Sequence, residues 1–138
     1  MAFESFNQLL VCDETITNIK AGNQEVGYEF KIQYPSYRGT FLSCIEKITV
    51  KVDGKLIDNG QIGFYINGKE VLIDELPELF REYWFTTDYA RVRVYGSGLE
   101  LESKHLVDVF LRHRIPYTGY FGNYMVEDSV CTKELEVV

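Results

Sequence analysis

Apolar and polar residues alternate with a period of two along much of this chain. Residues 26–34 and 106–115 are the two longest alternating segments. One face of the first would carry Val26, Tyr28, Phe30, Ile32 and Tyr34. One face of the second would carry Val107, Val109, Leu111, His113 and Ile115. Alternation of this kind is typical of half-buried β-strands, so the pattern predicts strands that turn one face toward a core.

Two dipeptides predict tight hairpins between extended segments. Asp53-Gly54 separates residues 48–52 from residues 55–57, and Asn67-Gly68 separates residues 61–66 from residues 69–73. A two-residue type I′ turn needs positive φ at both central positions, which Asp, Asn and Gly tolerate best. We therefore expect two antiparallel hairpins here. Residues 90–95 predict a further strand, and residues 15–20 and 132–138 predict weaker ones.

One segment has a helical rather than an extended pattern. Asp74 could cap a helix that begins at Glu75, and Pro77 would fall in its first turn, where the missing N–H is tolerated. The apolar positions then follow at helical spacing, namely Leu76, Leu79, Phe80, Tyr83 and Trp84. The pattern predicts a short α-helix laid over a sheet or closing the end of a barrel.

These elements together predict an all-β fold: an antiparallel β-sandwich or barrel-like domain with one short α-helix. A parallel sheet would need a helix between successive strands, and the sequence offers a single one. No linker-like composition divides the chain, so residues 1–138 are expected to form one domain.

Charge and composition exclude several function classes. The net charge is −7, from 14 basic and 21 acidic residues, which disfavours nucleic acid and anionic membranes as partners. No apolar stretch approaches the ~20 residues that span a bilayer, and no secretory signal is visible. Cys12, Cys44 and Cys131 form no CxxC pattern and are expected to be reduced thiols. We therefore expect a cytoplasmic protein.

The residues that could carry chemistry do not converge on a site. His105 and His113 share one predicted strand but would lie ~26 Å apart along it, too far to bind one metal ion. The many carboxylates stand in no motif that selects a pair, and Gly96-Ser97-Gly98 is typical of a turn rather than of a nucleophile elbow. We expect no catalytic residue, no metal ligand and no cofactor in this chain.

Two aromatic loops are instead typical of protein contact surfaces. Residues 34–40 contain Tyr37 and Arg38. Residues 116–124 contain Tyr117, Tyr120, Phe121 and Tyr124. Tyr and Arg are enriched where one protein docks on another. These six residues are our candidates for partner binding, although the loops could instead pack on their own core and Arg38 could form a salt bridge within the domain.

Residues 34–115 resemble the C-glycoside deglycosidase β subunit family. The resemblance is carried by the following segments, in order: Tyr34-Pro35-Ser36-Tyr37-Arg38-Gly39, Val50-Lys51-Val52-Asp53-Gly54, Phe64-Tyr65-Ile66-Asn67-Gly68-Lys69, Asp74-Glu75-Leu76-Pro77, Tyr83-Trp84-Phe85 and Ala90-Arg91-Val92-Arg93-Val94. The last strand of the resemblance leads into Ile115-Pro116-Tyr117, and residues 118–138 continue beyond it.

The resemblance implies a function that the residues alone do not. Enzymes of this family cleave the C–C bond between glucose and an aromatic aglycone, as in C-glucosyl flavonoids, after a separate oxidoreductase has formed the 3-oxo sugar. The ketone acidifies the neighbouring C2 proton, and elimination expels the aromatic carbon. A large TIM-barrel α subunit with a divalent metal, typically manganese, would carry this chemistry. The small β subunit would be its non-catalytic, sandwich-like partner in a hetero-oligomer.

Two other classes of function stay open at this point. Aromatic side chains on a flat sheet face could stack on sugar rings, as in a free-standing carbohydrate-binding module or another interaction module. A solitary small hydrolase would need a pair of carboxylates that the sequence does not single out.

Overall fold

The chain folds into one strongly curled sheet. The computed structural model describes residues 10–36, 38–115 and 125–138. Within them, nine strands form a sheet in the order β5-β4-β10-β11-β1-β2-β9-β6-β7, and β3 and β8 form a separate ladder of two strands. The strands are β1 (Thr15–Ala21), β2 (Gln24–Gln33), β3 (Thr40–Phe41), β4 (Ile45–Val52), β5 (Lys55–Leu56), β6 (Ile62–Ile66), β7 (Lys69–Leu72), β8 (Tyr83–Trp84), β9 (Tyr89–Tyr95), β10 (Lys104–Ile115) and β11 (Met125–Val137). Three short 3-10 helices connect them, η2 (Leu42–Cys44), η3 (Asn59–Gln61) and η4 (Ile73–Glu78).

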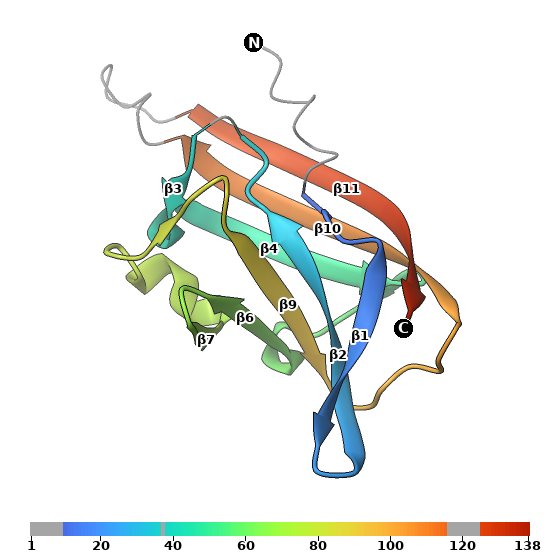
Figure 1. The fold of residues 1–138 in the computed structure, drawn as a ribbon. Coiled ribbons are helices and arrows are strands. Elements are labelled where there is room, and N and C mark those ends of the chain that lie inside the picture. Colours follow the sequence, from blue (N-terminus) through green and yellow to red (C-terminus); the bar gives the residue numbers. More distant parts are fainter. Residues whose placement is uncertain (1–9, 37, 116–124) are drawn as a thin grey trace.

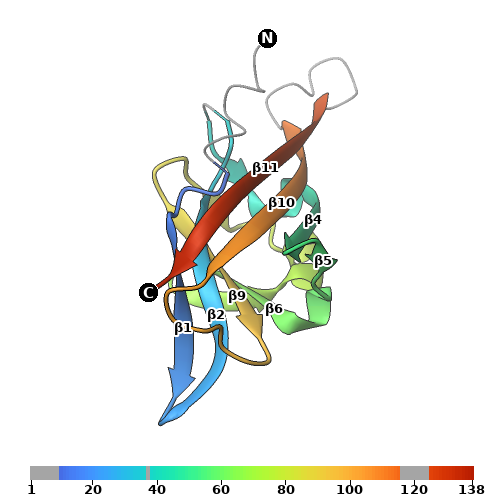
Figure 2. The ribbon, with the colours of Figure 1, turned by 90° about the vertical axis from the view of Figure 1, so that its right-hand side faces the viewer.

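The curl brings the two halves of the sheet face to face. Figures 1 and 2 show β10 and β11 crossing over β1, β2 and β9 as a second layer. The core lies between them. Strand β2 contributes Phe30 and Ile32, and strand β10 contributes Val107, Val109 and Leu111, all of them buried. The inward faces are those that the alternation predicted, so the all-β, sandwich- or barrel-like fold is confirmed.

A short seam joins the two halves. Strand β1 pairs with β11 in parallel through Thr15↔Glu136 and Ile16↔Val137, whereas the other ladders of the described sheet are antiparallel. The backbone N–H of Val138 also donates to the carbonyl oxygen of Ile16 at 3.0 Å. This one parallel contact is an exception to the predicted antiparallel pairing, and it joins the two halves of the curled sheet.

Both predicted hairpins are present. Asp53 and Gly54 have φ values of 54° and 81° and connect β4 to β5. Asn67 and Gly68 have the same pair of values, 54° and 81°, and connect β6 to β7. These are the positive φ angles that a type I′ turn requires, which explains why Asp-Gly and Asn-Gly stand at these points.

The predicted α-helix is absent, and this expectation is wrong. Residues Ile73–Glu78 form a 3-10 helix whose N-cap is Leu72, with no side-chain cap, so Asp74 does not cap it. The helix ends before Tyr83–Trp84, which are a strand paired with Thr40–Phe41. Leu76 is buried as expected, but Phe80 is 64% exposed, which a core-facing helical stripe would not allow.

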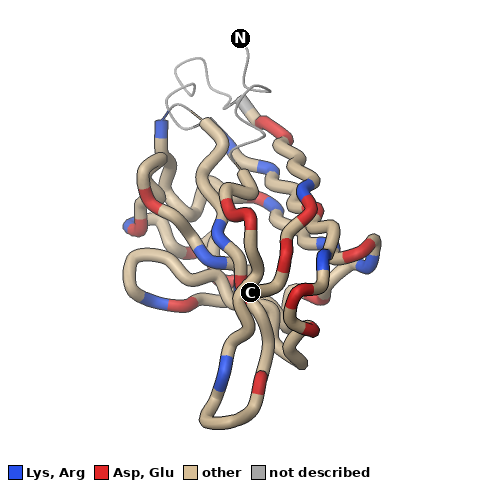
Figure 3. Tube along the Cα trace, turned by 45° about the vertical axis from the view of Figure 1, so that its right-hand side comes forward, with Lys and Arg blue, Asp and Glu red and all other residues tan. Residues whose placement is uncertain are grey.

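Charges are spread over the surface. Figure 3 shows acidic and basic residues interspersed along the chain rather than gathered into runs of one sign. Across the described ranges, no helix is long and apolar enough to cross a membrane.

Candidate docking surface

The ladder of β3 and β8 fixes the loop that the sequence singled out. Thr40 pairs with Trp84 and Phe41 pairs with Tyr83, so residues 40–41 are held against residues 83–84. Gly39 allows this approach, because a Cβ atom there would stand 2.3 Å from the carbonyl oxygen of Trp84. Any side chain at position 39 would therefore push the loop away from β8.

Three aromatic rings lie in a row along this ladder. The ring centroids of Phe41 and Tyr83 are 5.0 Å apart and those of Tyr83 and Phe85 are 4.6 Å apart. Phe41 is 40% exposed and Phe85 is 55% exposed, so the row presents aromatic surface to solvent. We call Phe41, Tyr83 and Phe85 the aromatic row. Large apolar side chains that stay together at the surface are typical of a contact with another molecule.

Strand alternation explains why the row faces outward. Trp84, between Tyr83 and Phe85, points the other way and is fully buried. Its ring centroid lies 5.3 Å from that of Tyr34 and 5.5 Å from that of Phe64, and its Nε1 donates to the carbonyl oxygen of Asp88 at 3.0 Å. The buried indole thus fixes the orientation of half-buried Tyr83 and exposed Phe85 on either side of it.

A buried polar cluster lies next to this indole. The Tyr34 hydroxyl is 2.7 Å from His113 Nδ1, and the Ser129 hydroxyl is 3.2 Å from His113 Nε2. His113 is completely buried, and burial lowers its pKa from 6.5 to about 4, although the charge of Asp128 opposes the shift. A neutral imidazole has one donor and one acceptor nitrogen, and each hydroxyl can complement either. The cluster therefore ties the end of β2 to β10 and β11 and has no outlet to solvent.

The second histidine has a structural role at the other end of β10. His105 Nδ1 lies 2.6 Å from Asp53 Oδ2, and His105 Nε2 lies 2.9 Å from the Ser103 hydroxyl. The hydrogen bond with His105 and one from the Leu106 N–H lower the pKa of Asp53. Both histidines are thus hydrogen-bonded within the domain, and they do not meet, as their spacing predicted.

The described residues contain no site suited to a metal ion. No three His, Cys, Asp or Glu side chains of residues 10–36, 38–115 and 125–138 gather closely enough to hold one. Cys12, Cys44 and Cys131 form no disulfide there. These residues do not fit the donor set of a catalytic metal centre, which takes three or more convergent ligands.

Ion pairs cover the outer face of the β2, β9, β6 and β7 half of the sheet. Arg93 Nε lies 2.9 Å from Glu29 Oε2, and Arg93 Nη1 lies 3.3 Å from Glu70 Oε1. Arg91 adds a contact to Glu29 at 3.4 Å, and the Tyr95 hydroxyl donates to Glu70 at 2.6 Å. These polar groups are therefore matched to one another, and exposed Leu72 and Tyr89 lie beside them on the same face.

The structure describes one of the six predicted contact residues. Arg38 is exposed and immediately precedes Gly39, so it lies beside the ladder that carries the aromatic row. Tyr37, Tyr117, Tyr120, Phe121 and Tyr124 lie outside the described residues. Contact of any of the six with a partner stays a prediction.

Sequence reasoning missed the aromatic row. The helical interpretation placed Tyr83 among core residues, and Phe41 and Phe85 were not considered. The short alternation Tyr83-Trp84-Phe85 was the signal that could have revealed an exposed pair flanking a buried indole.

Comparison with known proteins gives the chain its family. Residues 6–117 match the family model described as C-glycoside deglycosidase beta subunit. The C-glycoside deglycosidase beta subunit of Eubacterium cellulosolvens is 45% identical over 114 residues, which are 82% of this chain and 75% of that protein. The 3'-dehydrocarminate deglycosidase beta subunit of a Microbacterium species is 33% identical over 113 residues, or 82% of this chain and 85% of the relative. With a fold rich in strands and a family model that matches most of its length, the chain belongs to the C-glycoside deglycosidase beta subunit family.

Proposed function

We propose that this chain is the non-catalytic subunit of a two-subunit carbon–carbon lyase. In this proposal the substrate is a 3-oxo-C-glucoside, such as an oxidised C-glucosyl flavonoid. Loss of the C2 proton, acidified by the adjacent ketone, drives the aromatic carbon from C1, and that carbon takes up a proton. Support for an oxidised substrate comes from the name of the Microbacterium relative, a 3'-dehydrocarminate deglycosidase beta subunit, which specifies a dehydro compound.

One observation carries the proposal. In the described part of the chain, both histidines form hydrogen bonds within the domain, and ion pairs link charged side chains of the same domain. The aromatic row, by contrast, lies at the surface. A catalytic site needs polar groups that converge on a shared space, and a docking surface needs exposed apolar anchors. The arrangement supports docking rather than catalysis.

The catalytic machinery then belongs to the other subunit. A family of β subunits implies a partner chain. We propose that this partner is a large TIM-barrel α subunit that holds a divalent metal, with manganese as the proposed ion. We also propose that the complex works in the cytoplasm. The metal would supply polarisation of the oxo group. This chain would stabilise the large subunit, with the aromatic row and Arg38 in the contact.

Reconstitution tests the proposal. Each subunit is purified alone, and cleavage of a 3-oxo-C-glucoside is followed by chromatography of the released aglycone. We expect no cleavage by this chain alone and cleavage after mixing with the cognate large subunit. Turnover by the isolated chain would refute the non-catalytic role. Binding of an unoxidised glycoside by the isolated chain, measured by calorimetry, would favour a carbohydrate-binding module instead.

A pair of matched variants tests the docking surface. Phe85→Ser should weaken association with the large subunit by about 2 kcal/mol, or roughly 30-fold, because exposed aromatic anchors dominate such contacts. Leu101→Ser is the control, since Leu101 is 61% exposed against 55% for Phe85 and precedes the opposite end of β10. Equal affinities of the two variants for the large subunit would show that the aromatic row is not part of the interface.

A further inference from the structure

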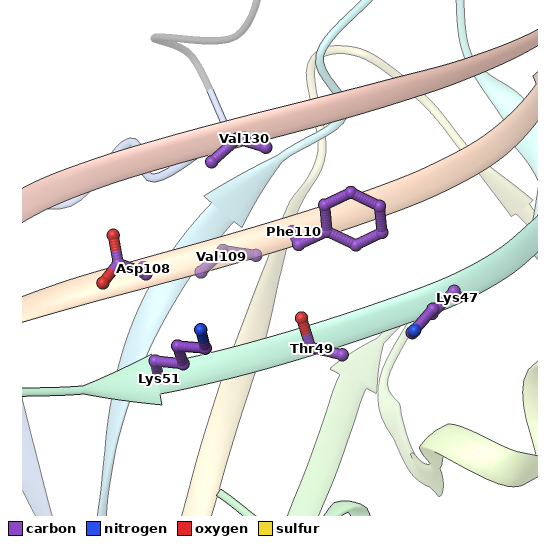
Figure 4. Close-up of a pocket in the computed structure, with 7 residues that line it drawn as sticks. All are labelled: Lys47, Thr49, Lys51, Asp108, Val109, Phe110 and Val130. Atoms are coloured by element: carbon purple, nitrogen blue, oxygen red, sulfur yellow. The ribbon is translucent and has the colours of Figure 1, made fainter. Parts of the chain in front are cut away.

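The outer face of β4, β10 and β11 carries a groove that is separate from the aromatic row. The groove has a volume of about 430 Å³ and is lined by Lys47, Thr49, Lys51, Asp108, Val109, Phe110 and Val130. Figure 4 shows these side chains on three neighbouring strands, with the Phe110 ring between Thr49 and Val130. The register agrees, because Phe110 pairs with Thr49 on β4 and with Val130 on β11.

The centre of this face is apolar and open to solvent. Val130 is 51% exposed, and Val126, four positions earlier on the same face of β11, is 47% exposed. Leu106 on the same face of β10 is 44% exposed, and Asp108 lies between it and Phe110. The opposite outer face of the molecule is covered by the Glu29, Arg93 and Glu70 ion pairs. Leu72 and Tyr89 are exposed on that opposite face as well, at 50% and 56%. Exposed apolar side chains that line a groove, such as Val130, are typical of a surface that a partner covers.

The charges at the edge of the groove say what kind of partner fits. Lys47 and Lys51 are exposed and form no ion pair or hydrogen bond within the described ranges. Neighbouring Arg112, by contrast, is paired to Asp128 at 2.8 Å. Among the lining residues the two lysines outnumber the single carboxylate, Asp108, in a chain whose net charge is −7. Lys51 stands opposite Asp108 in the strand register, and the charge of Lys47 helps to lower the pKa of Asp128. Neither lysine forms an ion pair with another described residue, so the two can still complement a surface that carries carboxylates.

Strand geometry sets the spacing of those carboxylates. Lys47 and Lys51 are four residues apart on the outer face of β4, which places them ~13 Å from each other along the strand. Thr49 lies between them, opposite Phe110. A complementary surface would therefore place an apolar side chain over Phe110 and Val130, with an acidic group on either side of it.

We propose that the large subunit binds this groove with an apolar surface flanked by two carboxylates, one facing Lys47 and one facing Lys51. This contact rests on the proposed function and adds a second surface, with its chemistry, to the one formed by the aromatic row. Arg112 lies over the Phe110 ring at 5.6 Å and occupies space that a stacked sugar would need.

Charge reversal tests the contact. The double variant K47E/K51E and the control K20E/K31E make the same change in net charge, but Lys20 and Lys31 lie on β1 and β2 in the other half of the sheet. Affinity for the cognate large subunit is measured by surface plasmon resonance at low and high salt. We expect K47E/K51E to bind roughly 100-fold more weakly, since like charges facing each other cost several kcal/mol, and the control to bind like the wild type. Wild-type affinity should also fall as salt rises.

The outcomes separate this proposal from the proposed function. If the wild type and K47E/K51E bind the large subunit equally well, the groove contact is overturned while the subunit role stands. If the wild type itself neither binds nor restores cleavage, the proposed function fails first. Concentration-dependent dimerisation of the isolated chain that F110S abolishes would show a second copy in the groove, and F110S-sensitive binding of a glycoside would show a sugar there. Either result would overturn the proposal.

Discussion

The buried histidine makes fold stability depend on pH in a predictable direction. His113 is fully enclosed, and burial lowers its pKa from 6.5 to about 4. In the unfolded chain the imidazole is exposed and regains its ordinary pKa. Between these two values the unfolded state therefore binds more protons than the folded state. Stability is highest above the unfolded pKa and is lost as the pH falls from there toward the folded pKa.

The two pKa values of His113 set the size of the effect. Each unit of pKa difference corresponds to about 1.4 kcal/mol, so a shift from 6.5 to about 4 corresponds to roughly 3 kcal/mol when complete. Between about pH 7 and pH 5 the expected loss from this single group is ~2 kcal/mol. Asp128 contributes little in this window, because its hydrogen bond with Arg112 lowers its pKa and leaves it ionised.

Urea unfolding of the isolated chain can measure this loss. Trp84 is the single tryptophan and is fully buried, so its fluorescence reports unfolding. The free energy of unfolding is compared between about pH 7 and pH 5 for the wild type and for His113→Gln, which cannot titrate. His105→Gln is the control, because it removes the other histidine of β10.

The change in the free energy of unfolding with pH, compared between the wild type and the variants, tests the pKa shift of His113. We expect His113→Gln to be less stable at neutral pH, since the Tyr34 and Ser129 hydroxyls lose a well-placed partner. Its stability should nevertheless fall by ~2 kcal/mol less than that of the wild type on acidification. The control keeps the buried His113 and should therefore keep the loss of stability that this group causes. Identical slopes for the wild type and His113→Gln would refute the conclusion that burial keeps this imidazole neutral.

Three further substitutions and one control have expected effects on stability, each measurable by urea or thermal unfolding. Tyr34→Phe removes the hydroxyl that contacts the buried imidazole and should cost about 1–3 kcal/mol; no loss would mean that the hydrogen bond is unimportant. Gly27→Ala would place a Cβ atom 2.2 Å from the carbonyl oxygen of Val94 and should cost about 2 kcal/mol or more by separating β2 from β9. Gly60→Ala, with 3.4 Å of space, is its control and should change stability by less than about 0.5 kcal/mol. Gly68→Ala meets no atom within 4 Å but has φ of +81°, so strain alone should cost about 1 kcal/mol; a neutral result would refute the type I′ argument.

The sheet was predictable because its signals are local. Alternation in residues 26–34 and 106–115 gave both the strands and their buried faces, and Asp-Gly and Asn-Gly gave the turns. The segment after Leu72 was not predictable in the same way. Its apolar spacing suited a helix, but pairing of Tyr83 and Trp84 with residues 40–41 decided the structure. Such long-range pairing overrides a local periodicity, and the partner strand cannot be identified from a short window of sequence.

The site was only partly predictable for a related reason. Parity placed His113 on the buried face of its strand, but its partners come from distant positions, Tyr34 and Ser129, and only the folded sheet brings them together. Arg38 was identified from composition and does lie at the surface. The groove around Phe110 needs three strands in register, so no single segment could reveal it.

The parallel contact of β1 with β11 has a consequence for how the molecule opens. Two residue pairs close the sheet there, and their members come from near opposite ends of the described chain. Bringing such distant segments together costs loop entropy that a few backbone bonds barely offset. Amide hydrogens of the β1–β11 contact should therefore exchange with solvent before those of the β10–β11 ladder. The domain should open locally at this contact while both layers stay folded.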